Sequence, residues 1–243
     1  MKLFKKHIYT LITRPREVFY HFFPGKISYS QSGEDMILDF LFRYKRDWFY
    51  VDVWANHPSR LSNTFFFYKY RWWKGINIEP NPSLWKQFLS QRKWDNNLNL
   101  WISSESWDLI FYEISPDTLS TFSKDAAEDY TLQWHTLAWE YKIPVLSLDQ
   151  LFSKYLWDHG KIDFLSIDTE GYDMIVLQSN NWEKYRPKAI VLETLEYKKN
   201  GGGVKIVWEF DVFLKGKDYF KYADTYLNTI FISKEFAHEI SFQ

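Results

Sequence analysis

A short apolar run that breaks at a polar turn is the feature that most constrains the fold. Residues 49–58 read Phe-Tyr-Val-Asp-Val-Trp-Ala-Asn-His-Pro, so β-branched and aromatic residues give way to small and polar ones. Such a run is typical of a buried strand that enters a turn. Asn56 or His57, followed by Pro58, then supplies a cap and a first helical position. The stretch therefore predicts a strand, a turn and the start of a helix.

Runs of the same kind follow along the chain. Strands are expected at 75–79, 97–102, 109–114, 145–148, 162–168 and 189–194, helices at 36–44 and 172–178, and a closing antiparallel pair at 219–223 and 226–232. Asn81 and Pro82 predict the cap and first position of another helix, which reaches about residue 91. Strands separated by helices pair in parallel. The sequence therefore predicts an α/β fold with a mostly parallel sheet.

Three of the expected strands end in a carboxylate, namely Asp52, Glu79 and Asp168. The carboxyl ends of parallel strands share one edge of a sheet, and α/β proteins bind ligands there. Glu79, after the second strand, is suited to accept both hydroxyls of a ribose. The first turn lacks the Gly-x-Gly-x-x-Gly pattern that admits a pyrophosphate, so a nucleoside without one fits better. S-adenosylmethionine is such a nucleoside, and carboxylates attract its sulfonium cation.

The composition restricts the function classes. The chain has 243 residues with 46% hydrophobic content, which suits one large or two small domains. A formal net charge of -1 gives no general attraction to nucleic acid, so no nucleic-acid partner is expected. The absence of cysteine excludes disulfides, thiolate nucleophiles and cysteine metal sites. It also fits a reducing compartment, and we expect a cytoplasmic protein.

Basic residues cluster at the amino terminus. We expect a basic helical arm at residues 1–27 ahead of one catalytic domain at residues 28–243. The arm carries the cations Lys2, Lys5, Lys6, Arg14 and Arg16 around a short apolar piece. A solvated helix is the simpler interpretation, and weak docking of the arm to a membrane surface is the alternative.

Tryptophan is unusually frequent in this chain and glycine unusually rare. There are 13 tryptophans and 9 glycines among 243 residues, whereas glycine averages roughly 7% in proteins. Several tryptophans stand in turn-like contexts, and Trp54 stands where a cofactor-binding turn normally has glycine, because the backbone must approach the ligand. We hypothesise that some of these tryptophans are glycines in the organism, through a codon reassigned to glycine.

Six segments together carry a family resemblance. They are Ser-Gln-Ser-Gly-Glu-Asp at 30–35, Tyr-Val-Asp-Val-Trp-Ala-Asn-His-Pro at 50–58, Ser-Asn-Thr at 62–64, Trp-Lys-Gly-Ile-Asn-Ile-Glu-Pro-Asn at 73–81, Ile-Asp-Phe-Leu-Ser-Ile-Asp-Thr-Glu-Gly at 162–171 and Tyr-Arg-Pro at 185–187. In this order they resemble the FkbM family of S-adenosylmethionine-dependent methyltransferases. The resemblance implies a Rossmann-like methyltransferase fold with helices on both faces of the sheet and an antiparallel final strand. The family has glycine where Trp54 and Trp72 stand, which agrees with the reassigned-codon hypothesis.

The resemblance also implies the residues of a site for S-adenosylmethionine. They are Gln31 and Glu34, which close over the site, Asp52, Trp54, Ala55 and Asn56 at the methionine end, Glu79 and Pro80 at the ribose, Ile102 and Ser103 at the adenine, and Asp168. Family members are mostly O-methyltransferases, so the expected acceptor is a hydroxyl on a sugar, a glycan or a secondary metabolite. An alcohol must lose its proton, and our candidates for the base are Asp168, then Glu193 or His57.

Two other functions stay open. The chain is a degenerate binding protein if Trp54 fills the cofactor pocket. It is a metal-dependent carbohydrate-active hydrolase if Asp168, Glu170 and Asp173 hold a cation. For the methyltransferase itself we assign no metal ligand.

Overall fold

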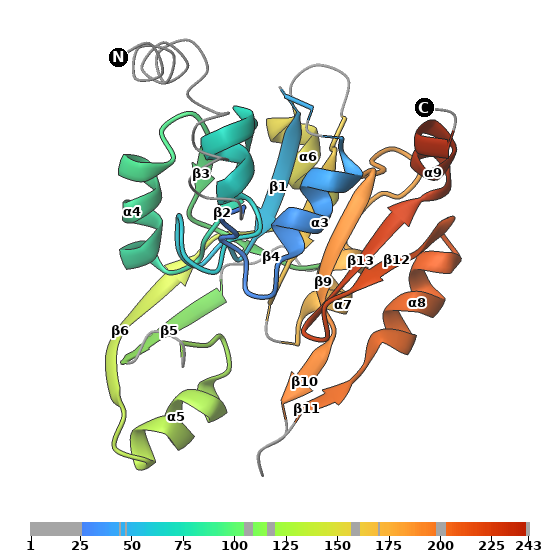
Figure 1. The fold of residues 1–243 in the computed structure, drawn as a ribbon. Coiled ribbons are helices and arrows are strands. Elements are labelled where there is room, and N and C mark those ends of the chain that lie inside the picture. Colours follow the sequence, from blue (N-terminus) through green and yellow to red (C-terminus); the bar gives the residue numbers. More distant parts are fainter. Residues whose placement is uncertain are drawn as a thin grey trace, which may run out of the picture.

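A seven-stranded sheet forms the centre of the molecule, in the order β12-β13-β9-β8-β1-β2-β3 (Figure 1). This computed structural model describes residues 26–43, 45–46, 48–104, 109–115, 120–156, 161–169, 171–197 and 203–241. The strands of the sheet are β1 (Phe49–Val53), β2 (Lys74–Ile78), β3 (Asn96–Leu98), β8 (Phe164–Ile167), β9 (Ala189–Glu193), β12 (Tyr219–Asp224) and β13 (Asn228–Ser233). Most of these strands were expected from the short apolar runs of the sequence.

The sheet is mostly parallel. Strand β1 pairs in parallel with β2 and β8, and the same direction continues to β3 and β9. Strand β13 runs antiparallel to both of its neighbours, β9 and β12. The central strands are buried on both faces, which is why they read as nearly continuous apolar runs. The predicted α/β class and the closing antiparallel pair are therefore confirmed.

Helices cover both faces of the sheet. On one face, the core around Val51 and Val53 packs against α6 (Leu148–Tyr155), α7 (Asp173–Gln178) and α8 (Val207–Lys215). On the other face, the core around Tyr50 and Phe164 packs against α3 (Glu34–Leu41), the π-helical turn η1 (Phe67–Arg71) and α9 (Lys234–Ser241). Alternate residues of each strand point to opposite faces, so β1 contributes to both cores.

Helix α4 (Pro82–Gln91) begins and ends where the sequence predicts. The Asn81 side chain accepts hydrogen bonds from the backbone N–H groups of Ser83 and Leu84, at 2.8 and 3.4 Å. Pro82 takes the first helical position, where its missing N–H costs nothing. The helix therefore starts directly behind the carboxyl end of β2.

The strand predicted at 97–102 is wrong as a single element. It divides into β3, in the main sheet, and β4 (Trp101–Ile102), which pairs with β7 (Val145–Leu146) in a separate small sheet. The cause is Asn99, whose side-chain amide donates to the carbonyls of Glu79 and Pro80 at 2.9 and 2.8 Å and turns the chain there. The strand expected at 145–148 is likewise shorter, because Ser147 caps helix α6.

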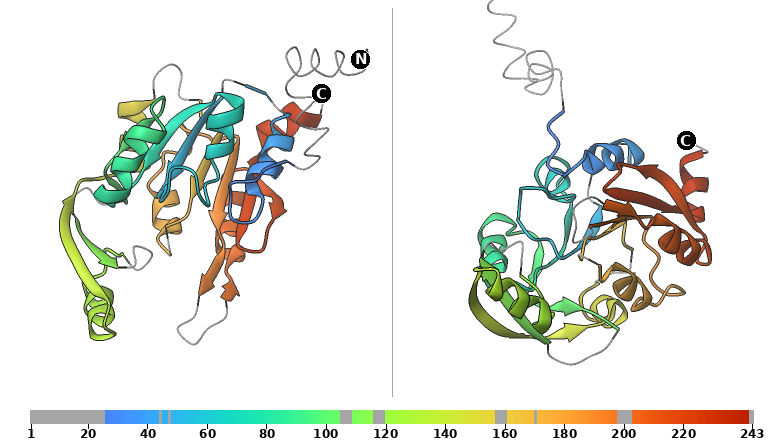
Figure 2. Two further views of the ribbon diagram at one scale, coloured as in Figure 1. Left: turned by 60° about the vertical axis from the view of Figure 1, so that its left-hand side comes forward. Right: turned by 90° about the horizontal axis from the view of Figure 1, so that it is seen from below.

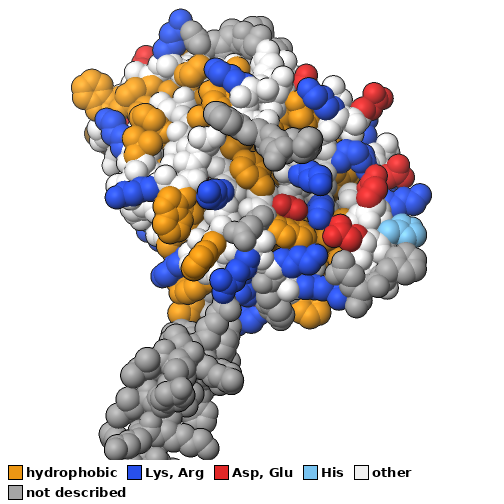
Figure 3. Space-filling model, turned by 90° about the horizontal axis from the view of Figure 1, so that it is seen from above, with side chains coloured by type: hydrophobic (Ala, Val, Ile, Leu, Met, Phe, Trp, Pro, Cys, Tyr) orange, Lys and Arg blue, Asp and Glu red, His pale blue; other side chains and the backbone are white. Residues whose placement is uncertain are grey.

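Two hairpins project from the carboxyl edge of the sheet (Figures 1 and 2). One is formed by β5 (Leu109–Ser115) and β6 (Thr136–Ile143) and carries α5 (Lys124–Leu132); the other pairs β10 (Leu195–Tyr197) with β11 (Gly203–Lys205). The sequence predicted β5 but not α5 or β6. Seen from the opposite end, lysine and arginine side chains are spread among hydrophobic ones (Figure 3).

Some expectations concern residues outside the ranges that the structure describes. Almost all of the predicted basic arm lies in residues 1–25, which the structure does not describe. Among the described residues, no helix combines the length and apolarity needed to span a bilayer.

Candidate functional site

Backbone hydrogen bonds join the carboxyl ends of β8, β1 and β2. The N–H of Asp168 donates to the carbonyl of Val53 at 3.4 Å, and the N–H of Ala55 donates to that of Ile78 at 2.9 Å. Asp168 directly follows β8 and Glu79 directly follows β2. These two predicted site residues therefore lie on one edge of the sheet, with the first turn between them.

Glu79 is the most firmly fixed acid of this edge. Its side chain is buried, and its two carboxylate oxygens accept the N–H groups of Asn56 and Asn81, both at 2.7 Å. Hydrogen bonds to an ionised acceptor are short and strong, so they lock the carboxylate in one orientation. A carboxylate accepts up to about four hydrogen bonds. The group thus has the chemistry that binds the two hydroxyls of a ribose, and Pro80 beside it is also buried.

The first turn has an unusual backbone. Trp54 and Asn56 adopt φ angles of 62° and 52°. This left-handed region suits glycine, and asparagine tolerates it, but it is an outlier for a bulky residue. Ala55, between them, is buried. The backbone therefore has the conformation of a glycine turn, although tryptophan occupies it.

The indole of Trp54 packs against Trp101 of β4. It is half-buried and contacts Trp101 edge to face, with ring centroids 5.2 Å apart and planes at 89°. Trp101 immediately precedes Ile102 and Ser103 in the chain, the residues predicted for the adenine. The indole therefore reaches from the predicted methionine end of the site to the predicted adenine end.

This edge fits S-adenosylmethionine in all but one respect. The acceptor chemistry of Glu79 and the backbone of the first turn fit the cofactor. The side chain of Trp54 does not, because a nucleoside that bridges the first turn and Ser103 needs the space through which the indole reaches Trp101. The misfit lies in one side chain and not in the architecture.

Asp52 lies one residue before the carboxyl end of β1. Its carboxylate is buried on the face of the sheet that also carries Tyr50, where it accepts a hydrogen bond from the Thr64 hydroxyl at 2.8 Å. Burial raises the pKa of Asp52, and the Thr64 hydrogen bond and the nearby Arg92 offset part of that rise. The structure gives Asp52 a packing role under the first turn, and its assignment as a cofactor ligand stays a prediction.

Arg92 is a buried residue near the site that sequence reasoning missed. Its guanidinium is fully buried and donates to Asp95 at 2.8 Å, to the Tyr50 hydroxyl at 2.6 Å, to Thr64 at 3.0 Å and to the carbonyl of Pro58 at 3.0 Å. Burial raises the pKa of Asp95, and Arg92 opposes the rise. Arg92 therefore supports the first turn from beneath. Nothing in the sequence distinguishes it from a surface arginine.

Glu34 ties the 30–35 segment to the far end of the chain. Its fully buried carboxylate accepts from the Thr225 hydroxyl at 2.6 Å and the Asn228 amide at 2.9 Å. Burial alone raises the pKa of Glu34, but these hydrogen bonds outweigh it and the pKa is lowered. Asn228 pairs with Glu193 in the sheet, so Glu34 lies near the carboxyl end of β9. Gln31 is exposed beside it.

The predicted adenine residues differ in accessibility. Ile102 is fully buried in the main core, whereas Ser103 is half-buried and its N–H donates to the carbonyl of Leu146 at 3.0 Å. Ser103 is therefore the member of the pair that can face a ligand.

The three candidate bases have different surroundings. Asp168 and Glu193 are half-buried at the carboxyl ends of the adjacent strands β8 and β9. His57 instead uses Nδ1 to accept the N–H groups of Ser59 and Arg60, at 3.1 and 3.0 Å. A nitrogen that accepts two backbone N–H groups acts as a turn cap, which competes with a role in proton transfer.

Asp173 has the most perturbed carboxyl at this edge. It is buried at the start of α7 and accepts the N–H groups of Thr169 and Gly171 at 3.4 and 3.3 Å. Burial raises its pKa from 3.8 to about 6. It holds the turn that carries Asp168. The metal alternative also needs Glu170, which lies outside the described residues, and among those described no three acids or histidines are placed to hold a metal ion.

A family model described as the methyltransferase FkbM domain matches residues 52–231. This chain belongs to the FkbM methyltransferase family. The six-motif resemblance is therefore confirmed. Glu79, Trp54 and Asp168 lie inside the matched part of this FkbM chain, whereas Gln31 and Glu34 precede it.

One solved structure similar to this FkbM chain is a crystal structure of methyltransferase FkbM from Methylobacillus flagellatus KT. The two share 10% sequence identity with a TM-score of 0.44, over 77% of this chain and 43% of the other. This chain thus spans less than half the length of that protein. Comparison with curated proteins gives no match.

Proposed function

We propose that this chain is an S-adenosylmethionine-dependent methyltransferase with a Rossmann-like fold, and that it methylates a hydroxyl on a sugar, a glycan or a secondary metabolite. The observation that carries the proposal is the buried carboxylate of Glu79, fixed by two backbone N–H groups at the end of β2. This is the position from which an acid binds a ribose in nucleotide-binding α/β folds. Membership of the FkbM family supports the reaction class.

The proposed roles follow the order of the strands. The turn of residues 52–56 faces the methionine end, Glu79 and Pro80 face the ribose, and Ser103 faces the adenine. Asp168, at the end of β8, is our first candidate to hold the proton of the acceptor hydroxyl. Glu193, on the adjacent strand, is the second, and His57 ranks third because its Nδ1 caps a turn.

Calorimetric titration with S-adenosylhomocysteine tests this proposal, with Trp54→Gly as the protein because the indole is the one misfit. We expect saturable binding, followed by transfer of a labelled methyl group from S-adenosylmethionine to members of a panel of hydroxyl compounds. A correctly folded Trp54→Gly protein that does not bind S-adenosylhomocysteine rejects the proposal.

The second candidate function is a binding protein that has lost its cofactor. The contact between Trp54 and Trp101 favours it, because an indole in that place excludes a nucleoside. Under this alternative, the unchanged chain binds a glycan or small molecule without S-adenosylhomocysteine. The methyltransferase proposal instead requires that the Trp54→Gly protein binds S-adenosylhomocysteine.

Partners and location are proposals as well. We propose a cytoplasmic protein whose partner is its small-molecule or glycan acceptor, with no nucleic-acid partner and weak contact between the basic arm of residues 1–27 and anionic membranes. Co-sedimentation with anionic vesicles at low salt, compared between the full chain and a chain lacking the arm, tests the last point. Equal co-sedimentation of both chains rejects it.

A further inference from the structure

Three tryptophans have a backbone conformation that belongs to glycine. The φ angles of Trp54, Trp72 and Trp134 are 62°, 62° and 70°, in the same left-handed region as Gly33 at 88°. In this region the Cβ of an L-residue lies too close to the following carbonyl oxygen, and only glycine escapes that contact. Among the described non-glycine residues, three of the eight with positive φ are tryptophans. Asparagine and aspartate are the residues normally enriched there.

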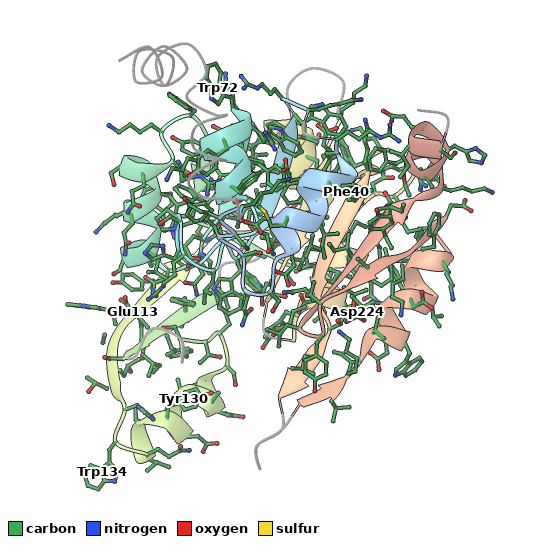
Figure 4. All side chains as sticks on the ribbon, viewed as in Figure 1. Phe40, Trp72, Glu113, Tyr130, Trp134 and Asp224 are labelled. Carbon is green, nitrogen blue, oxygen red and sulfur yellow. The ribbon has the colours of Figure 1, made fainter. Side chains whose placement is uncertain are left out.

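Two of these side chains make little contact with the protein. Trp134 is 96% exposed, and Trp72 is 61% exposed, with the guanidinium of Arg46 5.3 Å from its ring centre. Figure 4 shows both at the outside of the molecule, Trp72 at the upper end and Trp134 at the tip beyond α5. The burial that normally stabilises a tryptophan is therefore missing at two positions with a left-handed backbone.

Other tryptophans of the chain behave in the opposite way. The indole N–H groups of Trp73, Trp85 and Trp182 donate to backbone carbonyls, at 3.1, 3.0 and 3.0 Å. Trp73 is fully buried, although it is the direct neighbour of the exposed Trp72. The structure thus separates positions where the indole is used in a hydrogen bond from positions where the backbone conformation favours a residue without a Cβ.

We propose that glycine occupies positions 54, 72 and 134 in the protein as its own cell makes it, and that glycine at position 54 opens the nucleoside site. The first statement rests on backbone conformation at all three positions and, at positions 72 and 134, also on exposure. The second rests on the proposed function, because it takes the indole of Trp54 as the obstacle to the cofactor. The family resemblance pointed to positions 54 and 72, and the backbone conformation adds position 134.

Equilibrium unfolding of variants tests the first part of the proposal, that the backbone at these positions favours glycine; we call this the backbone statement. We expect Trp134→Gly and Trp72→Gly each to raise the folding equilibrium constant by roughly three- to tenfold, because glycine removes the left-handed penalty but gains freedom in the unfolded chain. Trp134→Ala keeps a Cβ and should give no such rise. Trp139→Gly, at a 67% exposed position in the strand β6, is the matched control and should lower the constant. The statement is overturned if Trp134→Gly is no more stable than Trp134→Ala, or if Trp72→Gly is no more stable than the unchanged chain.

Calorimetry with S-adenosylhomocysteine tests position 54. We expect Trp54→Gly to bind roughly tenfold or more tightly than the unchanged chain, since the ligand no longer has to displace an aromatic contact. Equal affinity of the two proteins overturns the inference for position 54 and leaves the proposed function standing. If neither binds while the glycine variants at 72 and 134 are stabilised, the proposed function fails and the backbone statement holds.

Mass spectrometry of the protein purified from its own cells tests occupancy directly. We expect the peptides that contain positions 54, 72 and 134 each to be lighter by one tryptophan-to-glycine difference, with Trp73, Trp85 and Trp182 unchanged. Tryptophan masses at all three positions overturn the proposal.

Discussion

At the scale of single residues, the carboxyl edge depends on acids that accept backbone N–H groups. Glu79 holds the turn after β1 and the start of α4, and Asp173 holds the turn after β8. Each acid therefore fixes a loop that the proposed ligand would contact. A change at either residue should alter both the stability of the fold and the geometry of the site.

Replacing Glu79 by glutamine should weaken binding and stability together. The new NH₂ group faces a backbone N–H of Asn56 or Asn81, so one buried donor loses its acceptor, at a cost of about 1–3 kcal/mol. We expect a lower denaturation midpoint and, in the Trp54→Gly protein, weaker binding of S-adenosylhomocysteine. Glu113→Gln, on the projecting hairpin, is the control and should leave binding unchanged (Figure 4). Unaltered binding by the Glu79 variant would exclude a ribose contact.

Asp173 should make stability depend on pH. Its folded pKa of about 6 lies above the ordinary 3.8, so the folded state holds the proton more tightly than the unfolded state. Its contribution is therefore fully present below pH 3.8 and is lost as pH rises through 6, by about 3 kcal/mol. We expect the free energy of unfolding of Asp173→Asn to depend less on pH between pH 4 and 6 than that of the unchanged chain. Asp125→Asn, at an exposed site on α5, should retain the slope; an unchanged slope for the Asp173 variant contradicts the assignment.

At the scale of elements, the start of α4 links secondary structure to the site. The Asn81 side chain caps the helix while its own N–H donates to Glu79, so one residue serves both features. The helix boundary was predictable because capping chemistry is local. The division between β3 and β4 was not, because Asn99 turns the chain only through hydrogen bonds to Glu79 and Pro80, which follow β2.

Removing this cap should destabilise the protein by about 1 kcal/mol. In Asn81→Ala the N–H groups of Ser83 and Leu84 lose their acceptor, whereas Asn81→Asp keeps one. Urea denaturation followed by circular dichroism measures the difference. Equal loss in both variants would show that the hydrogen bonds of the cap do not stabilise the helix.

At the scale of the whole molecule, Glu34 connects segments that are distant in the chain. It joins the 30–35 motif to the turn between β12 and β13, across a sequence separation of 194 residues to Asn228. This contact brings the start of the domain against its last hairpin at the carboxyl edge. The predicted closure of this segment over a ligand at the edge stays a prediction.

Glu34→Gln should therefore affect global stability and its acid sensitivity. The folded pKa of Glu34 is lowered below its ordinary 4.5, so its contribution is present above pH 4.5 and is lost as pH falls through the folded value. We expect the variant to be about 1–3 kcal/mol less stable at pH 7, with a smaller further loss on acidification. Thermal unfolding at pH 7 and below pH 4 measures both. A variant as stable as the parent at pH 7 contradicts this role.

The sequence determined what depends on neighbouring residues. Apolar runs ending in turns predicted where the central strands lie along the chain, Asn81 and Pro82 predicted the start of α4, and Glu79 was recognisable as an acid at a strand end. Six ordered motifs gave the family. These signals are local in the chain, so they can be recognised without knowing which residues are in contact in the folded protein.

Only the tertiary structure decided what depends on burial and on distant partners. The burial of Asp52 under the first turn, the hydrogen bonds of Arg92 and the raised pKa of Asp173 arise from chain segments that meet after folding. Sequence composition raised the question of the tryptophans, but backbone conformation separated them, because a φ angle is set by the turn and not by the residue that occupies it.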